Sequence, residues 1–317
     1  MNRILVTGCA GFIGSHLCEE LVKNNEVIGI DNFDLFYDKS IKQSNINNLL
    51  KHPNFKFLEI DIRSNLVSEI PETIDFIIHL AAKAGVRPSI LKAEDYIDVN
   101  INGTHSVIKF AIEKNIKKFI FASSSSIYGN NNLIPFCEHH QTDNPVSPYA
   151  FTKKSCELMN YSFHHLHQID FINLRFFTVF GPRQRPDLAI HKFVKAIYNA
   201  QPITLYGDGK TYRDYTYVAD IVDGIVKAKD YLAANNHVFE TINLGNNSPV
   251  SLKDLVEEIK KITARNLEII GLPMQDGDVN YTYANIDKAK KMLGYRPQTS
   301  MKSGLAEFVK WYAATQN

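Results

Sequence analysis

Tyr149 and Lys153 stand four residues apart, and their types and spacing suit proton transfer. At that spacing two side chains of a helix lie on one face, so a lysine ammonium can approach a tyrosine hydroxyl. A free phenol has a pKa of about 10 and is a poor base at neutral pH, but a neighbouring positive charge favours the phenolate. Tyr149 is therefore a candidate general base. Taken alone, such a pair is as consistent with an ordinary protein surface as with a catalytic site.

Four consecutive serines, Ser123 to Ser126, stand earlier in the chain at the end of the apolar segment Lys118–Ser123. That segment has the pattern of a parallel strand, and open α/β sheets bind ligands at the carboxyl ends of such strands. Ser124 is a candidate for relaying or orienting a substrate proton. The alternative is a serine-rich turn without chemistry, which the ordered occurrence of serines and Tyr-x-x-x-Lys disfavours.

Three glycines in Thr7-Gly8-Cys9-Ala10-Gly11-Phe12-Ile13-Gly14 follow a short apolar segment and precede a helical pattern. Glycines there permit a tight turn and let the backbone approach a pyrophosphate, which the free N–H groups of the following helix stabilise. The segment therefore predicts a dinucleotide site. An ordinary strand-to-helix turn is the alternative.

Asp31 ends the next strand pattern, seventeen residues after Gly14. A carboxylate there can accept hydrogen bonds from ribose hydroxyls and repels a 2′-phosphate, so it favours NAD over NADP. A turn residue in Asp31-Asn32 is the alternative. Asp61-Ile62, after the third strand pattern, is a further candidate for the adenine edge, although a turn or N-cap role is equally consistent with the sequence.

The elements that must position these residues alternate between strand and helix through the first half of the chain. Near-continuous apolar segments, typical of parallel strands covered on both faces, alternate with helical patterns such as Val107, Ile108, Ala111 and Ile112. We expect an α/β fold: a Rossmann-type doubly wound parallel sheet with a smaller mixed α/β C-terminal substrate domain. The predicted strands are Arg3–Thr7, Glu26–Asp31, Phe55–Asp61, Phe76–Ala81, Lys118–Ser123 and Phe171–Phe177.

The alternation stops after Gly181-Pro182, where glycine and proline interrupt shorter elements. We expect residues 1–178 to form the NAD-binding domain, with 214–245 returning to it. Residues 179–317 would mainly form a smaller substrate-binding domain, packed so that a cleft lies between the two.

Composition excludes several classes of protein. The chain has 317 residues with 35 Lys plus Arg against 34 Asp plus Glu, and this balance argues against nucleic-acid binding. No apolar stretch approaches the roughly 20 residues of a membrane span, and the N-terminus lacks a signal-peptide pattern, so we expect a cytoplasmic protein with no membrane partner.

Cysteine and histidine spacing does not indicate a metal centre. Cys9, Cys18, Cys137 and Cys156 are far apart, so free thiols are expected rather than disulfides or a zinc site. The helical histidines 164, 165 and 167 and the loop pair His139-His140 have no carboxylate at ligand spacing. We therefore expect no metal.

Together these motifs resemble those of the extended short-chain dehydrogenases/reductases, and within them the nucleotide-sugar 4-epimerases. The resemblance covers essentially the whole chain. It is carried by Thr7–Gly14, Asp31-Asn32, Asp61, His79–Ala82, Asn100, Ser123–Gly129, Tyr149 with Lys153, Leu174–Pro182, Arg213–Asp220, Gly294–Pro297 and Trp311-Tyr312.

The resemblance implies a redox-neutral reaction in which Tyr149 takes the proton of a sugar 4-hydroxyl through Ser124, with Lys153 alongside. It also implies a homodimer formed through two helices at the face of the sheet. Arg213 would contact the diphosphate and Asp278 the uridine ribose; a surface ion pair with Asp214 and a loop cap are their respective alternatives. Asp276 replaces the usual proline of that loop. The implied NAD-binding residues are Gly8, Gly11, Phe12, Ile13, Gly14, Asp31, Asn32, Asp61, Ile62, Leu80, Ala81, Ala82, Asn100, Tyr149 and Lys153.

The segments Ala84–Ser89 and Gly181–Phe193 resemble those of UDP-glucuronate 4-epimerases. A uronate carboxylate must be paired or hydrogen-bonded in its site. The candidate residues for this task are Arg87, Ser125, Ser126, Thr178 and Arg185, although Arg185 could instead lie at the rim of an exposed loop.

We therefore expect interconversion of UDP-glucuronate and UDP-galacturonate. UDP-glucose and UDP-N-acetylglucosamine 4-epimerases share the catalytic residues and remain alternatives. A uronate decarboxylase shares the 4-keto intermediate, whereas a 4,6-dehydratase needs an acid that Ser125-Ser126 does not supply. A non-catalytic NAD-binding module is disfavoured because Tyr149 and Lys153 are both present.

Overall fold

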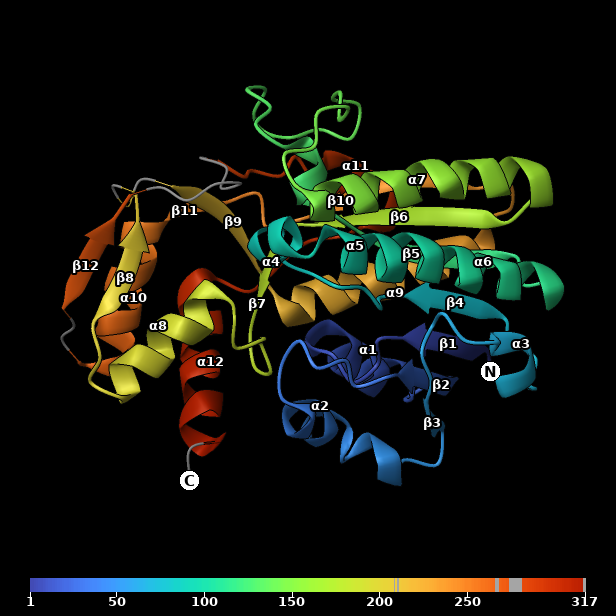
Figure 1. The fold of residues 1–317 in the computed structure, drawn as a ribbon, viewed down its shortest axis with the longest axis horizontal. Helices are drawn as coiled ribbons and strands as arrows, with labels where there is room; N and C mark the ends of the chain where they lie inside the picture. Colours follow the sequence, from blue (N-terminus) through green and yellow to red (C-terminus); the bar gives the residue numbers. More distant parts are fainter. Residues whose placement is uncertain (208, 210, 266–267, 274–280, 316–317) are drawn as a thin grey trace.

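Short runs of Ile, Val and Phe form the strands of a seven-stranded parallel sheet, in the order β10-β6-β5-β4-β1-β2-β3 (Figure 1). The computed structural model describes residues 1–317 except 208, 210, 266–267, 274–280 and 316–317. The expected α/β doubly wound sheet is confirmed. The strands of this sheet are β1 (Arg3–Thr7), β2 (Glu26–Asp31), β3 (Phe55–Glu59), β4 (Phe76–His79), β5 (Lys118–Ser124), β6 (Asp170–Phe176) and β10 (Phe239–Leu244).

Side chains alternate between the two faces of the sheet and build two separate cores. Ile120 of β5 belongs to a core that also includes Leu17 and Ile225, from helices α1 (Phe12–Leu21) and α9 (Val218–Ala234). Its neighbour Phe119 belongs to the opposite core, with Val107 of α6 (Gly103–Glu113). Helix α7 (Pro148–His167) and the short α3 (Leu66–Glu69) contribute to that second core.

The remaining helices connect the strands or line their carboxyl ends. They are α2 (Lys39–Ile46), η1 (Leu49–Lys51), α4 (Val86–Leu91), α5 (Ala93–Tyr96), η2 (Ile97–Asn102) and η3 (Ser125–Tyr128). None of the described helices is long and apolar enough to cross a membrane.

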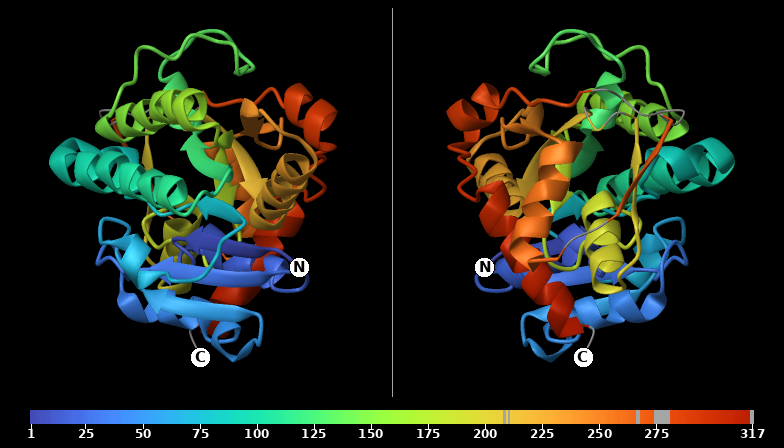
Figure 2. Two further views of the ribbon diagram at one scale, coloured as in Figure 1. Left: turned by 90° about the vertical axis from the view of Figure 1, so that its right-hand side faces the viewer. Right: turned by 90° about the vertical axis from the view of Figure 1, so that its left-hand side faces the viewer.

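A third core lies among elements of the C-terminal half of the chain. Its buried residues include Phe180, Phe193, Leu255 and Phe308. Figure 1 shows most of these elements on one side of the molecule and the large sheet on the other, and the two views of Figure 2 look along that direction from either end. The elements are β7 (Thr178–Phe180), α8 (Ala189–Tyr198), β8 (Ile203–Tyr206), β9 (Tyr212–Tyr217), β11 (Pro249–Ser251), α10 (Leu252–Thr263) and α12 (Met301–Thr315). β12 (Ile269–Leu272) pairs with β8, whereas α11 (Asp287–Leu293) contributes Ala289 and Leu293 to the core that contains Leu17 and Ile120.

Five of these strands form two small sheets, and β10 returns to the large sheet. β7 and β11 flank β9, and β12 pairs with β8. β10 runs parallel to β6 along its whole length, from Phe239 beside Phe171 to Leu244 beside Phe176. The chain therefore crosses to the small sheets and comes back to the large sheet before it ends.

The start of α7 is fixed by local chemistry. The Ser147 hydroxyl accepts a hydrogen bond from the Ala150 N–H at 3.2 Å, and Pro148 occupies the first helical position. A serine N-cap followed by proline is a strong helix start. Tyr149 and Lys153 consequently lie in the first turns of α7, beside the end of β5.

Candidate active site

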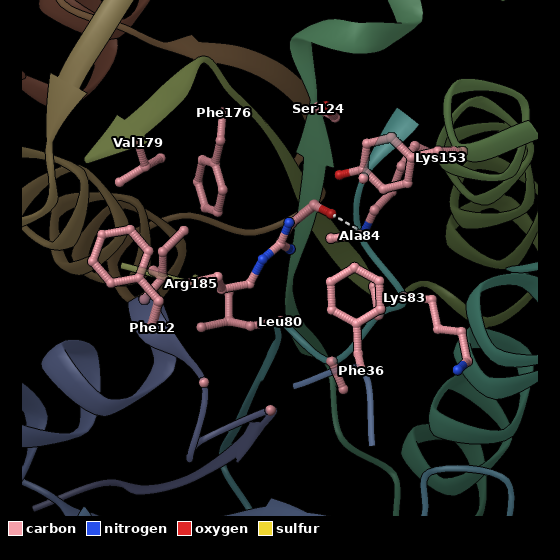
Figure 3. Close-up of a pocket in the computed structure, with 18 of the residues that line it drawn as sticks. Phe12, Phe36, Leu80, Lys83, Ala84, Ser124, Lys153, Phe176, Val179 and Arg185 are labelled. Carbon is pink, nitrogen blue, oxygen red and sulfur yellow. Dashed lines mark hydrogen bonds between the residues drawn. The ribbon is translucent and has the colours of Figure 1, made fainter. Parts of the chain in front are cut away.

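One large cavity of about 490 Å³ lies at the carboxyl ends of β1, β2, β4 and β5. Figure 3 shows the Arg185 side chain reaching into it near Leu80 and Phe36, with Ser124 and Lys153 on one wall. The cavity brings together twenty of the residues predicted to act on cofactor or substrate. They are Gly8, Gly11, Phe12, Ile13, Gly14, Asp31, Asn32, Asp61, Ile62, Leu80, Ala81, Ala82, Ser124, Ser125, Ser126, Tyr149, Lys153, Thr178, Arg185 and Arg213.

The glycine turn has no room for side chains. Gly8 has φ +73°, and a Cβ on it would lie 2.8 Å from the backbone nitrogen of Ala81. A Cβ on Gly14 would lie 2.1 Å from the Gly8 carbonyl oxygen. Helix α1 begins after Gly11, which offers no side-chain cap, and its first turn carries no acidic residue. The first N–H groups of α1 are thus available to an anionic group in the cavity, as a pyrophosphate requires.

Asp31 ties the end of β2 to this turn. Its carboxylate accepts hydrogen bonds from the backbone N–H groups of Ala10, at 3.2 Å, and Phe33, at 2.8 Å. Burial raises the pKa of Asp31, and these hydrogen bonds act in the opposite direction. Asp31 therefore has a structural role in the turn as well as a place on the cavity wall.

Asp61 combines the two roles that the sequence left open. It lines the cavity, and it also accepts hydrogen bonds from the Arg63 side chain at 2.6 and 2.8 Å and from the Arg63 N–H at 2.9 Å. The Asn32 amide donates to it at 2.8 Å. These contacts hold the pKa of Asp61 down at about 2, so it is an anion at neutral pH.

Asn100 is the one predicted cofactor residue that does not line the cavity. It is buried behind the wall, accepts from the Lys83 N–H at 2.8 Å, and donates to the Lys83 carbonyl and the Thr152 hydroxyl, both at 3.0 Å. Its amide joins the strand-end segment after β4 to α7. Asn100 therefore supports residues of the cavity wall from behind and does not itself line the cavity.

Tyr149 and Ser124 meet across the gap between α7 and β5. Burial raises the pKa of Tyr149, whereas a hydrogen bond with Ser124 and the positive charge of Arg185 lower it. The Tyr149 N–H donates to Ser89 at 3.1 Å, and its ring packs edge-on against Tyr96 at 6.3 Å. The phenol is therefore fixed at the start of α7, with its hydroxyl hydrogen-bonded to Ser124 and within the influence of the Arg185 charge.

Lys153 lies one turn further along α7. Its ammonium donates a hydrogen bond of 2.7 Å to the Ala122 carbonyl and lies 4.9 Å from the centre of the Phe121 ring. Burial lowers its pKa to about 8. It remains largely protonated at neutral pH, as the stabilisation of a phenolate requires.

Arg185 comes from the loop after β7 and forms two hydrogen bonds with Asp187, at 2.9 and 2.8 Å. Its guanidinium lies 5.3 Å from the centre of the Phe36 ring. With a side chain 17% exposed, Arg185 is not a rim residue. The Ser126 N–H donates a hydrogen bond to the Ser124 hydroxyl at 3.1 Å, so Ser126 lies directly beside Ser124.

The other predicted basic residues occupy different places. Arg213 lines the cavity and donates to the Tyr212 carbonyl at 2.9 Å. Arg87 stands outside the cavity wall, with its guanidinium 4.9 Å from the centre of the Tyr206 ring. Asp276 and Asp278 lie outside the described residues.

Several residues of the wall were not predicted from the sequence. Phe36, Tyr37, Lys42 and Lys83 line the cavity. Lys83 pairs with Asp34 at 3.1 Å. The segment Asp31-Asn32-Phe33-Asp34-Leu35-Phe36-Tyr37 at the end of β2 contains aromatic residues next to Asp31, the aspartate predicted to bind the ribose, but no spacing rule ties them to a ligand.

Comparison with known proteins places the chain in a family. Residues 5–308 match the family model described as GDP-mannose 4,6 dehydratase. A UDP-glucuronate 4-epimerase of Thermodesulfobacterium geofontis is 41% identical over 316 residues, which cover 98% of this chain and 96% of that protein.

Two solved structures have the same fold over nearly their whole length. The Bacillus cereus UDP-glucuronic acid 4-epimerase, in complex with UDP-glucuronic acid and NAD, has a TM-score of 0.94 and 36% identity, with 99% of each chain covered. The Methanobrevibacter ruminantium UDP-N-acetylglucosamine 4-epimerase has a TM-score of 0.91 and 32% identity, also with 99% of each chain covered. The resemblance read from the sequence is confirmed, and the chain belongs to the GDP-mannose 4,6 dehydratase family, among relatives that include UDP-sugar 4-epimerases.

Proposed function

We propose that this protein catalyses the NAD-dependent, redox-neutral epimerisation of a UDP-sugar at C4, interconverting UDP-glucuronate and UDP-galacturonate. The observation that carries the proposal is the meeting of Tyr149, Ser124 and Arg185 in one cavity that also contains the glycine turn. An acid–base group, its hydrogen-bonding serine and a carboxylate-binding cation thus face the same space. The names of the relatives in the comparison support the same reaction.

NAD fits the cofactor half of the cavity. The closely packed glycines, the uncapped start of α1 and the carboxylate of Asp31 are suited to a pyrophosphate and a ribose. Residues 1–178, together with 214–245, would hold the cofactor, and residues 179–317 would mainly hold the nucleotide sugar. NAD, when bound, supplies the reversible hydride acceptor that a redox-neutral epimerisation needs.

Tyr149 is the base that removes the proton of the sugar 4-hydroxyl, and it returns the proton when the epimer forms. Ser124 orients the phenol and shares its proton, because the two side chains are hydrogen-bonded. Lys153 provides a positive charge on the same face of α7, where it is held by the Ala122 carbonyl. The protein itself thus supplies the acid–base groups for proton transfer.

The sugar must rotate within the site between the two half-reactions, so it needs to be held more loosely than the nucleotide. Arg213 and Asp278 are proposed to grip the diphosphate and the uridine ribose. Arg185, Thr178, Ser125 and Ser126 are proposed to bind the uronate carboxylate through exchangeable polar contacts. Arg87, which stacks on Tyr206, would support this end from outside the wall.

A 4,6-dehydratase is disfavoured although the family model is described by that name. Elimination of water from C5 and C6 needs an acidic group beside the serine, and Ser125 and Ser126 provide hydroxyls. The carboxylates that line the described part of the cavity are Asp31, Asp34 and Asp61, which lie at or just after the ends of β2 and β3. They lie in the half proposed for the cofactor, and Asp34 is paired with Lys83.

A UDP-uronate decarboxylase would use the same base and the same 4-keto stage, so the products decide between the two reactions. Purified protein supplied with NAD and UDP-glucuronate should yield UDP-galacturonate, identified by proton NMR, with no net NADH and no carbon dioxide. Release of carbon dioxide and formation of a UDP-pentose would show that the protein is a decarboxylase and not an epimerase. No turnover of any UDP-sugar would favour a non-catalytic NAD-binding module.

We also propose a homodimer, in which α7 of each copy packs against the other. Phe151, Leu158 and Leu166 of α7 are exposed by 43%, 59% and 68%, and helical spacing places them on one broad face. A second copy of this chain would bury that apolar face. Size-exclusion chromatography with light scattering should report a dimer, and Leu158→Glu should report a monomer. A monomeric wild-type protein would contradict this proposal.

The cytoplasm is the proposed location. Cys9, Cys18, Cys137 and Cys156 are free thiols, a state typical of reducing compartments.

A further inference from the structure

Cys137, His139 and His140 form a cluster of potential metal ligands outside the cavity. One donor atom from each of the three residues lies within 4.8 Å of the others. Figure 1 shows that the segment between η3 and α7, which carries them, projects from the molecule beside α11. The sequence predicted no metal here because the histidines have no carboxylate at ligand spacing and the cysteines are far apart, but Cys137 supplies a sulfur ligand beside the two histidines.

The backbone at the start of this turn is fixed by hydrogen bonds of Phe136. Phe136, which is fully buried, forms a bridge with Ala284: its N–H donates to the Tyr283 carbonyl at 2.6 Å, and its carbonyl accepts from the Asn285 N–H at 3.0 Å. The backbone next to Cys137 is therefore held against the segment that leads into α11. Preformed ligand positions reduce the entropy that metal binding must overcome.

Glu138, which follows Cys137 in the turn, is held by hydrogen bonds from the large sheet. Its carbonyl accepts a hydrogen bond from Arg175 at 3.3 Å, and its carboxylate accepts one from the Asn243 N–H at 2.8 Å. Both partners belong to strands of the large sheet, Arg175 to β6 and Asn243 to β10. Glu138 is thus held against the sheet, while its neighbours carry the three donor groups of the cluster, of which the Cys137 thiol donates to the Pro135 carbonyl at 3.5 Å.

Two hydrogen bonds close the turn between Cys137 and His140. The His140 N–H donates to the Cys137 carbonyl at 3.0 Å, and the Cys137 N–H donates to His140 Nδ1 at 3.2 Å. Nδ1 therefore carries no proton, and it can bind a metal ion once it exchanges the bond from the Cys137 N–H for a bond to the metal. The His139 and His140 rings are 4.8 Å apart and nearly perpendicular.

We propose that Cys137, His139 and His140 bind one divalent zinc-type cation. Thiolate and imidazole ligands suit Zn²⁺, with bonds of about 2.3 Å to sulfur and about 2.0 Å to nitrogen. Donors on such an ion stand roughly 3.5 Å apart. Metal binding therefore requires the side chains to rotate so that the donor separation shortens from as much as 4.8 Å to that spacing. The fourth position is taken by water.

The site is structural and independent of the proposed reaction. None of its three residues lines the cavity. A bound ion would fix the conformation of the turn next to the bridge between Phe136 and Ala284. It would thereby stabilise the long segment that leads from η3 to α7.

Cobalt(II) is the probe, because a thiolate ligand gives it a charge-transfer band and a tetrahedral site gives it intense visible bands. The experiment titrates the full-length, metal-free protein with Co²⁺ and then displaces it with Zn²⁺. Cys137→Ser and His140→Asn are the test variants. His165→Asn is the matched control, since His165 is an exposed histidine that also follows another histidine but has no cysteine beside it.

We expect both bands to saturate at one Co²⁺ per chain, to disappear on addition of Zn²⁺, and to persist in His165→Asn. Cys137→Ser should lose the charge-transfer band, and His140→Asn should weaken binding at least tenfold. Zn²⁺ should raise the thermal midpoint of wild type but not of Cys137→Ser, with epimerase activity unchanged in both. Absence of a thiolate band, its persistence in Cys137→Ser, or saturation at half an ion per chain would each overturn the proposal.

Discussion

Arg185, which lines the cavity, forms a two-bond ion pair with Asp187, with bonds of 2.9 and 2.8 Å. A guanidinium has five N–H donors, so this pair leaves donors that a substrate carboxylate can use. The same cation acts on Tyr149 and lowers its pKa. One residue therefore links substrate recognition to the state of the proposed base.

Replacing Arg185 should reduce turnover of the uronate selectively. In Arg185→Gln, kcat/KM for UDP-glucuronate should fall about 10- to 100-fold, since a charged hydrogen bond contributes roughly 1.5–3 kcal/mol. The loss for UDP-glucose should be several-fold smaller. Arg265→Gln, whose guanidinium stacks on Tyr198 away from the cavity, is the control. Equal losses for both substrates would show that Arg185 does not read the carboxylate.

Removing the Ser124 hydroxyl should shift the pH dependence of the reaction. The hydrogen bond from Ser124 lowers the pKa of Tyr149, so its loss in Ser124→Ala raises that pKa. The acid limb of kcat/KM should move to higher pH, and the value at neutral pH should fall about 100-fold. Ser162→Ala, at an exposed position of α7, serves as the control. An unmoved acid limb would separate Ser124 from the proton path.

Glu157 and Arg175 form a buried ion pair beneath the site, and both side chains are almost inaccessible to water. Ser123 also donates to the Glu157 carboxylate, at 2.5 Å. Glu157→Gln leaves the guanidinium without its partner and should cost about 3–5 kcal/mol of unfolding free energy in urea titrations. The double change Glu157→Gln with Arg175→Met should cost less than Glu157→Gln alone. If the single change costs under about 1 kcal/mol, the pair does not stabilise α7 against the sheet.

His79 should make the protein less stable in mild acid. The imidazole is buried between Thr7, at 2.6 Å, and Thr104, at 3.0 Å, and burial lowers its pKa to about 3. The unfolded chain protonates this histidine near pH 6.5, whereas the folded chain does not, so stability falls as the pH drops from about 6.5 toward 3. The slope is at most about 1.4 kcal/mol per pH unit.

Urea unfolding at pH 7 and pH 5 tests this account of His79. His79→Gln should show a smaller loss between the two values than wild type, and the exposed His165→Gln should match wild type. The same loss in wild type and His79→Gln would assign the acid sensitivity to other groups.

The parts of the fold that follow local patterns were predictable. Arg3–Thr7 and Glu26–Asp31 were predicted with the bounds that the structure shows, because buried parallel strands are continuous apolar runs ended by polar turns. The predicted strands 55–61 and 76–81 are shorter in the structure, ending at Glu59 and His79. Their last residues bend away to form the cavity wall, which an apolar pattern does not reveal.

The site was predictable where a motif carries a physical requirement. Gly8 and Gly14 are such a case, since any side chain there meets backbone atoms. Asn100 was assigned to the cofactor, yet its amide is used by Lys83 and Thr152, which depends on long-range packing. Phe36 and Lys83 face the cavity for the same reason, and the cluster of Cys137 with His139 and His140 depends on the conformation of one turn.

The central claim is that the cavity is built for a uronate. The most direct measurement compares kcat/KM for UDP-glucuronate and UDP-glucose on the same NAD-loaded protein, each followed by the appearance of its C4 epimer. We predict a preference for UDP-glucuronate of well over tenfold, because leaving a buried charged group without its partner costs about 1–3 kcal/mol or more. Equal turnover of the two sugars would contradict the account.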